Sequence, residues 1–393
     1  MQKNLKEEES SVVNCKFKIS SLKEAIKYFE GSLKAHPERD AFVAEEAVME
    51  GKRRRDPLII LNHLARPDDN YIPVGELELP EVVAPKSPEG NLAREIITKL
   101  EPLKLMNPVW AGFDLGKGPG TLATCFGIPI NREAENTSAY TKTLDEVLTE
   151  PIPDPEDSGL LPEIRSRIAF VKENTPEWFK ISRPDTQGPY NLALILIGEE
   201  ALTVPYTAPE KFRKLMERIT DFWIEVIKNL NAWIGRERLA PLSRLTRICE
   251  CAVNNVSARM YKEHILSQDI RIAQTFGSVD VHTCSGPHVF HVTLENIPDI
   301  AATEAGFIER ATAGYTPVEE AVSAIGARPV ILRIGQELLP GREFEVIKED
   351  LDRCEDNPRI LFSYTGMSWL KKDRPAIREL HQKVDDYWRR KYG

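Results

Sequence analysis

Strand-like and helix-like segments alternate along this chain from about residue 108 to its end. Apolar runs typical of short strands cover residues 109–115, 179–184, 245–249, 279–284, 306–311, 329–334 and 359–364. Helical spacing is found at residues 160–173, 209–234, 257–276, 317–325, 343–354 and 375–387, with a helix or turn at 289–297. This alternation is typical of βαβ units that share a parallel sheet. With residues 57–61 as an eighth strand, it favours an α/β fold of the (β/α)8 TIM-barrel type, and an open doubly wound sheet is the alternative.

The first 107 residues do not follow this alternation. A helix is expected to begin near Ser21, because Ser21 and Glu24 have the spacing of a capping box. A second helix is expected at 92–100, where Pro102 follows as a stop signal. We therefore divide the chain into a mostly helical N-terminal extension, residues 1–107, which can include the first strand, and a barrel, residues 108–393. We expect the extension to act as a cap or as the contact of a homodimer.

The composition excludes some classes of function. Hydrophobic residues make up 41% of the chain, which is enough for a sizeable core, and 52 basic against 61 acidic residues give a net charge of −9. Sequence-independent binding of nucleic acid needs clustered cations, so we expect no nucleic-acid partner. The first 11 residues are charged and polar, and no apolar run reaches about 18 residues, so neither a signal peptide nor a membrane span is expected. These features predict a cytoplasmic protein with no membrane partner.

Polar and ionisable residues gather on or just after the predicted strands. In a parallel barrel the C-terminal ends of the strands form the face that carries the active site. We therefore take these residues as candidates for catalysis and binding. They are Asp114, Arg183, Asp185, Gln187, Cys249, Glu250, Cys251, His282, Cys284, Glu309, Arg310, Arg333, Gln336, Glu337, Tyr364 and Thr365.

Two pairs of residues have the spacing of metal ligands. His282 and Cys284 lie two apart on a predicted strand, so both side chains point to one side. Imidazole and thiolate together suit zinc. Cys249 and Cys251, at the end of the preceding strand, form a second pair that can supply the remaining ligands. The alternative interpretation is that the cysteines are small buried hydrophobes and that His282 is a hydrogen-bonded core residue.

Several segments resemble the uroporphyrinogen decarboxylase (URO-D) superfamily. Residues 185–193, DTQGPYNLA, are similar to its G-x-P-[WF]-T-L motif, and His282-Thr283-Cys284 is similar to its H-x-C-G strand. Residues 109–127, which end in Cys-Phe-Gly, resemble the Gly-rich and F-G segments of its long members outside haem synthesis. Residues 360–366 resemble its last strand. The likeness covers about residues 108–390, with the motifs in the same order and at similar spacing.

Within this superfamily the chain resembles the cobalamin-dependent methyltransferases more than the decarboxylases of haem synthesis. The resemblance implies a zinc enzyme that moves a methyl group to or from a corrinoid carried by a partner protein, with a small molecule as the other methyl donor or acceptor. His282 and Cys284 match two of the family's metal ligands. The third falls near Thr365, where the family has a cysteine, and one residue is inserted after Cys284. Cys251 is our candidate for the missing ligand, with Glu250 as its acidic substitute.

The resemblance also suggests roles for the other candidates. Acidic residues would protonate or polarise a leaving group, and for this catalytic role we name Glu250, Asp185 and Glu309. Substrate contacts are expected from Asp114, Arg183, Gln187, Tyr190, Gln336 and Tyr364.

Two other functions are compatible with the same fold. The first is a decarboxylase or lyase that acts on a carboxylated or tetrapyrrole substrate. The Arg-rich strand and the F-S-D segment of the haem-pathway decarboxylases have no match here, and Ile195 stands where those enzymes have a tyrosine. The second is a non-catalytic barrel that binds a corrinoid or tetrapyrrole.

Overall fold

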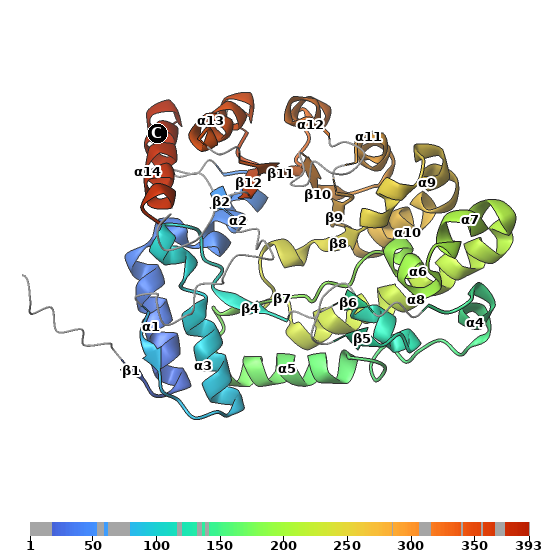
Figure 1. Ribbon diagram of the computed structural model, residues 1–393, viewed down its shortest axis with the longest axis horizontal. Coiled ribbons are helices and arrows are strands. Elements are labelled where there is room, and N and C mark those ends of the chain that lie inside the picture. The colour runs from blue at the N-terminus through green and yellow to red at the C-terminus, as the bar shows by residue number, and fades with distance from the viewer. Residues whose placement is uncertain are drawn as a thin grey trace, which may run out of the picture.

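The computed structural model describes residues 18–52, 59–61, 79–115, 120–131, 136–137, 141–284, 286–305, 316–338, 341–354, 357–365 and 374–392. Within these residues the chain is a mixed α/β protein with parallel sheets (Figure 1).

The largest sheet is parallel and has six strands. Its order is β2-β12-β11-β10-β9-β8, and every neighbouring pair is parallel. The order follows the sequence from β8 to β12, and β2, the earliest strand of the sheet, lies beside β12, the latest. The predicted parallel α/β fold is therefore confirmed. The strands are β2 (Ile59–Leu61), β8 (Thr246–Cys249), β9 (Val279–His282), β10 (Ile300–Ala305), β11 (Ile331–Glu337) and β12 (Ile360–Thr365).

Two further strands, β4 (Gly112–Asp114) and β7 (Lys180–Ser182), form a separate parallel pair. An isolated bridge joins Ile181 of β7 to Leu239, which lies on the chain that leads into β8. Among the described residues, no pairing joins β4 to β2 or β7 to β8. Closure into a barrel therefore stays a prediction. The remaining strands are β1 (Lys18–Ile19), which pairs with β3 (Glu81–Val82), and β5 (Ile130–Asn131), which pairs with β6 (Asn136–Thr137).

One predicted strand is displaced. The sequence pattern placed it at 306–311, which lies outside the described residues, and the structure has β10 just before that range, at Ile300–Ala305. This segment, IAATEA, carries three alanines and a glutamate and lacks the bulky apolar alternation from which a strand is predicted. The other seven predicted strands overlap β2, β4, β7, β8, β9, β11 and β12.

Helices cover the sheet strands from the outside. In Figure 1, α12 and α13 lie along β10–β12 on the side away from β4 and β7. The described helices are α1 (Leu22–Ala35), α2 (Ala41–Met49), α3 (Pro88–Thr98), α4 (Leu144–Thr149), α5 (Leu161–Asn174), α6 (Pro189–Ile197), α7 (Glu200–Thr207), α8 (Pro209–Ile234), α9 (Ala258–His264), α10 (Leu266–Phe276), α11 (Pro287–Asn296), α12 (Val318–Ile325), α13 (Glu343–Cys354) and α14 (Arg374–Tyr392). Short 3-10 turns occupy Pro37–Arg39, Pro102–Leu105, Leu122–Phe126, Leu242–Arg244 and Cys251–Asn255.

The longest described helix, α8, has the bounds that its periodicity predicted. Its buried stripe includes Phe212, Trp223 and Ile227. Helix α6 was not predicted, because its sequence, PYNLALILI, is apolar almost throughout and has no amphipathic period. At the start of α1, Ser21 accepts a hydrogen bond from the backbone N–H of Glu24 at 3.3 Å, as predicted. The Glu24 carboxylate also accepts from the backbone N–H and the hydroxyl of Ser20, at 2.7 and 2.9 Å.

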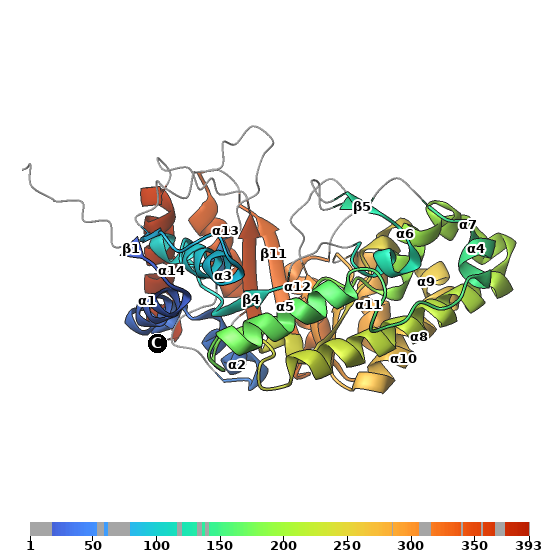
Figure 2. The same cartoon turned by 90° about the horizontal axis from the view of Figure 1, so that it is seen from below.

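The N-terminal helices lie beside the C-terminal one. Both views place α1, α3 and α14 at one end of the molecule (Figures 1 and 2). A buried ion pair joins them, in which Arg39 donates to Asp385 of α14 at 2.5 Å. None of the described helices combines the length and the apolar character required to cross a membrane.

Candidate metal centre

Four polar residues form one row across neighbouring strands of the large sheet. Cys249 of β8 is paired with His282 of β9, and Glu304 of β10 is paired with Arg333 of β11. The pairing of Val281 with Thr303 places His282 beside Glu304. Because side chains alternate along a strand, the residues of one row point to the same face of the sheet.

The ligand atoms of Cys249, Cys251 and His282 all lie within 4.8 Å of one another. The two sulfurs are 3.7 Å apart, and the sulfur of Cys284 is 3.4 Å from Nε2 of His282. Around a tetrahedral zinc ion with bonds of about 2.3 Å to sulfur and about 2.0 Å to nitrogen, two sulfurs lie about 3.8 Å apart, and sulfur and nitrogen about 3.6 Å apart. Both measured separations are close to those edges. Thiol and imidazole ligands together are typical of zinc sites.

The remaining nitrogen of His282 faces a carboxylate. Nδ1 of His282 lies against Oε1 of Glu304, and Oε2 of Glu304 is 3.6 Å from Arg333. Burial alone would lower the pKa of His282, but the charge of Glu304 raises it well above its usual range. Burial alone would raise the pKa of Glu304, but His282 and Arg333 lower it to about 2. A carboxylate on Nδ1 fixes the ring and leaves Nε2 directed at the sulfurs, as in many zinc sites.

A second row with charged residues lies two residues earlier along β8 and β9. Asp280 is two residues before His282 on β9 and accepts hydrogen bonds from Arg247 at 3.2 Å and from Arg333 at 2.8 Å. The charges of these two rows balance one another, and the same face also carries the buried apolar residues Ala302, Ile331 and Leu361. The opposite face carries the buried apolar residues Ile248, Val281, Leu332, Ile334 and Phe362.

The thiol of Cys249 is protonated in this environment. Its hydrogen bond with Cys251, together with burial, raises the pKa of this thiol far above its usual range. A divalent cation reverses this tendency, because a coordinating thiol loses its proton. The cluster can thus take up a metal ion with release of protons.

The structure brings together two of the three residues predicted as metal ligands, Cys251 and His282, and adds Cys249. The third, Cys284, contacts Nε2 of His282 at 3.4 Å but lies outside this group of three. Thr365, which the resemblance suggested as the place of a third ligand, ends β12, and β10 and β11 separate this strand from β9. Glu304 was missed because its strand was predicted six residues too late. The signal that could have found it is its place in the row with His282.

Glu250, predicted to be catalytic, is fully buried between the two cysteines of its turn. Its carboxylate accepts hydrogen bonds from the backbone N–H groups of Tyr190 at 2.9 Å and Asn191 at 3.0 Å, at the start of α6. Burial and the charge of Asp269 raise its pKa well above the usual range. Tyr190 itself is buried against Phe212, and its hydroxyl has no hydrogen-bond partner among the described residues.

The other residues on the loop after β7 bond mainly to one another or to the backbone. Asp185 is exposed, and its carboxylate accepts from the side-chain amide of Gln187 at 2.7 Å. Arg183 donates to the carbonyl oxygens of Ser243 and Leu245, and burial lowers its pKa to about 10. The guanidinium of Arg183 is therefore directed at the backbone before β8.

The last group of predicted residues is not gathered at the cluster. Tyr364 is fully buried, stacks on Phe362 on the apolar face, and donates to Asp350 of α13 at 3.1 Å. The polar row meets β12 at Leu361, three residues before Tyr364, and an odd separation turns the Tyr364 side chain to the other face. Asp114 is exposed at the end of β4. Gln336 lies in β11 with its side chain outside the described residues, and Glu309 lies outside them altogether.

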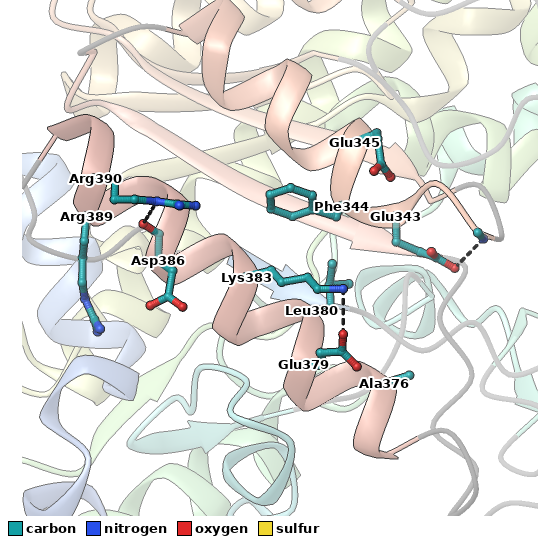
Figure 3. Close-up of a pocket in the computed structure, with 11 residues that line it drawn as sticks. Glu343, Phe344, Glu345, Ala376, Glu379, Leu380, Lys383, Asp386, Arg389 and Arg390 are labelled. Atoms are coloured by element: carbon teal, nitrogen blue, oxygen red, sulfur yellow. Dashed lines mark hydrogen bonds and ion pairs between the residues drawn. The ribbon is translucent and has the colours of Figure 1, made fainter.

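One groove lies elsewhere, between α13 and α14, with a volume of about 880 Å³. Figure 3 shows that charged side chains of both signs line this groove, together with the apolar side chains of Phe344 and Leu380. Many of these charges are already paired, such as Lys383 with Glu379 at 2.7 Å. No candidate site residue borders this groove.

Comparison of the sequence with protein-family models and with curated proteins finds no match.

Proposed function

We propose that this chain is a zinc-dependent methyltransferase that resembles the cobalamin-dependent branch of the URO-D superfamily. The observation that carries the proposal is the convergence of Cys249, Cys251 and His282, with Cys284 beside His282, at the C-terminal ends of neighbouring parallel strands. Reacting groups gather at this end in parallel α/β enzymes.

The proposed framework is a (β/α)8 barrel. Its support is the order of the strands, since a closed barrel must bring its first and last strands together and β2 pairs with β12. The short pair β4-β7 supplies the second and third strands in chain order. The pairings of β2 with β4 and of β7 with β8 would complete the ring.

The proposed chemistry is transfer of a methyl group between a corrinoid on a partner protein and a small-molecule thiol. When bound, zinc supplies a positive charge that lowers the pKa of a thiol, so that a thiolate nucleophile exists at neutral pH. Cys249, Cys251 and His282 would hold the ion, and Glu304 would fix the ring of His282. A catalytic zinc has three protein ligands and one exchangeable position. Cys284, which follows β9 and lies 3.4 Å from Nε2 of His282, would stand beside the ion as a further thiol.

The test measures both the zinc content and the methyl-transfer activity of the same proteins. We expect about one zinc per chain in the wild type and in Cys125→Ser, since Cys125 belongs to the turn Leu122–Phe126, outside the cluster. Zinc should be lost in His282→Ala and Cys251→Ala. Anaerobic incubation with methylcobalamin and a small thiol should consume the methyl-corrinoid in the first two proteins and not in the others.

Two results would contradict the proposal. An equal rate of methyl transfer in the wild type and His282→Ala would show that the cluster takes no part. Conversion of uroporphyrinogen to partly decarboxylated products, by a protein without zinc, would favour the decarboxylase alternative.

A further inference from the structure

The turn that carries Cys249 and Cys251 is bound to the first turn of α6. Glu250 lies between the two cysteines and is 0% exposed. One oxygen of its carboxylate accepts from the N–H of Tyr190 at 2.9 Å, and the other accepts from the N–H of Asn191 at 3.0 Å. These amides belong to the first turn of a helix, where N–H groups have no partner within the helix. Glu250 therefore caps α6 from a distant part of the chain.

Backbone hydrogen bonds fix the chain on either side of Glu250. The N–H of Gly188 donates to the carbonyl oxygen of Cys249 at 2.6 Å. The side-chain oxygen of Asn191 accepts from the N–H of Ala252 at 2.7 Å. Cys249 itself and Ala252, the residue after Cys251, are thus both hydrogen-bonded to residues at the start of α6.

The same turn is also fastened to the strand of the histidine ligand. The backbone N–H of Glu250 donates to the carbonyl oxygen of His282 at 2.7 Å. Glu250 is therefore bonded to α6 through its side chain and to β9 through its backbone. Any movement of this residue changes the position of both sulfurs relative to the imidazole.

Gly188 makes the close approach of Glu250 to α6 possible. A Cβ atom at position 188 would lie 2.4 Å from the carboxyl carbon of Glu250, which no real contact allows. The carboxylate of Glu250 thus lies directly against the backbone of Gly188, where no side chain stands between them. A merely space-filling residue at position 250 would leave two buried amides without partners, which is costly.

We propose that Glu250 is a positioning residue for the metal centre, which sets the geometry of Cys249 and Cys251 and does not take part in proton transfer. This inference rests on the proposed metal centre. Both of its oxygens already accept amide hydrogen bonds, so the carboxylate is directed at α6. Partners that orient metal ligands affect metal affinity by roughly 10- to 100-fold.

The experiment compares three variants of the full chain. Glu250→Gln replaces one accepting oxygen by an NH2 group, which cannot accept from an amide. Gly188→Ala keeps the carboxylate but displaces it. Asp40→Asn is the matched control, since Asp40 accepts from the N–H groups of Phe42 and Val43 at the start of α2, outside the cluster. Zn²⁺ affinity is measured by competition with a chelator, and Co²⁺ is added to record the visible bands that report coordination geometry.

We expect Glu250→Gln and Gly188→Ala to bind Zn²⁺ roughly 10- to 100-fold more weakly than the wild type and to shift the Co²⁺ bands, while Asp40→Asn matches the wild type in both. Unaltered affinity and unaltered bands in a folded Glu250→Gln or Gly188→Ala protein would overturn the inference and leave the metal centre standing. A wild type that binds neither ion would overturn the metal centre itself, and the inference with it. If Glu250→Gln does not fold, the Gly188→Ala result decides.

Discussion

His282 contacts a sulfur through one ring nitrogen and a carboxylate through the other. This arrangement needs Cys284 in the turn after β9 and Glu304 on the next strand. The first contact was predicted from a shared strand face, but β9 ends at His282 and Cys284 has a φ of 48°, so the turn brings the two side chains together. The second contact could not be predicted, because it depends on the register between β9 and β10, which local sequence does not specify. Tyr364 shows the same limit, since an error of one position in the predicted register reverses the face.

Glu304→Gln is expected to weaken zinc binding by roughly 10- to 100-fold, because the amide no longer holds Nδ1 of His282 as an anion does. Chelator competition measures this change. Glu320→Gln is the control, since Glu320 forms a similar pair with His291 at 2.6 Å outside the centre. Equal affinities for the two variants would show that Glu304 does not act through His282.

His381 of α14 predicts a pH dependence of stability. Burial, together with the charge of Arg39, lowers the pKa of this histidine to about 3 from an ordinary value of 6.5. Below pH 6.5 the unfolded chain therefore binds a proton that the folded chain does not, so stability falls as the pH falls from about 6.5 towards 3. Between pH 7 and pH 5 the wild type should lose about 2 kcal/mol more free energy of unfolding than His381→Gln. Urea unfolding at the two pH values measures the difference, and parallel losses would contradict it.

Among the elements, periodicity predicted best where one face of a helix meets the core. The bounds of α8 and α13 match the predicted ranges, and those of α12 differ by one residue. Prediction failed for α6, whose residues are buried on nearly all sides, and for β10, whose residues are small and polar. Burial on all sides removes the period from which a helix is predicted. Both failures adjoin the candidate centre, where Glu250 caps α6 and β10 supplies Glu304.

The loop before α6 depends on α8. The indole of Trp223, in the middle of α8, is fully buried and donates to the carbonyl oxygen of Gln187 at 2.7 Å. Trp223→Phe keeps an aromatic ring but leaves this oxygen without its donor, so we expect a loss of about 1–3 kcal/mol in the free energy of unfolding. Trp233→Phe, at a half-buried position near the end of the same helix, should cost less. Urea titrations compare the two, and equal losses would argue against the hydrogen bond.

At the scale of the whole molecule, the two ends of the described chain are held together. Arg39 follows α1 and Asp385 belongs to α14, yet their side chains form a buried ion pair. The sequence suggested an N-terminal extension but gave no sign of its contact with α14, because residues this far apart are related only through the fold.

Asp385→Ala should reduce the free energy of unfolding by about 3–5 kcal/mol, because it leaves the charge of Arg39 buried without a partner. Glu379→Ala is the control on the same helix, since Glu379 pairs with Lys383 at the surface and its loss should not be measurable. Chemical unfolding followed by circular dichroism measures both. A similar, small effect of the two variants would mean that the N-terminal helices are not held by this pair.

The central claim is that Cys249, Cys251 and His282 hold a zinc ion. X-ray absorption at the zinc edge of the purified protein tests it most directly. We predict a first shell with at least two sulfurs at about 2.3 Å and at least one nitrogen at about 2.0 Å. A protein that retains no zinc after zinc loading, or a shell of oxygen and nitrogen without sulfur, would contradict the claim.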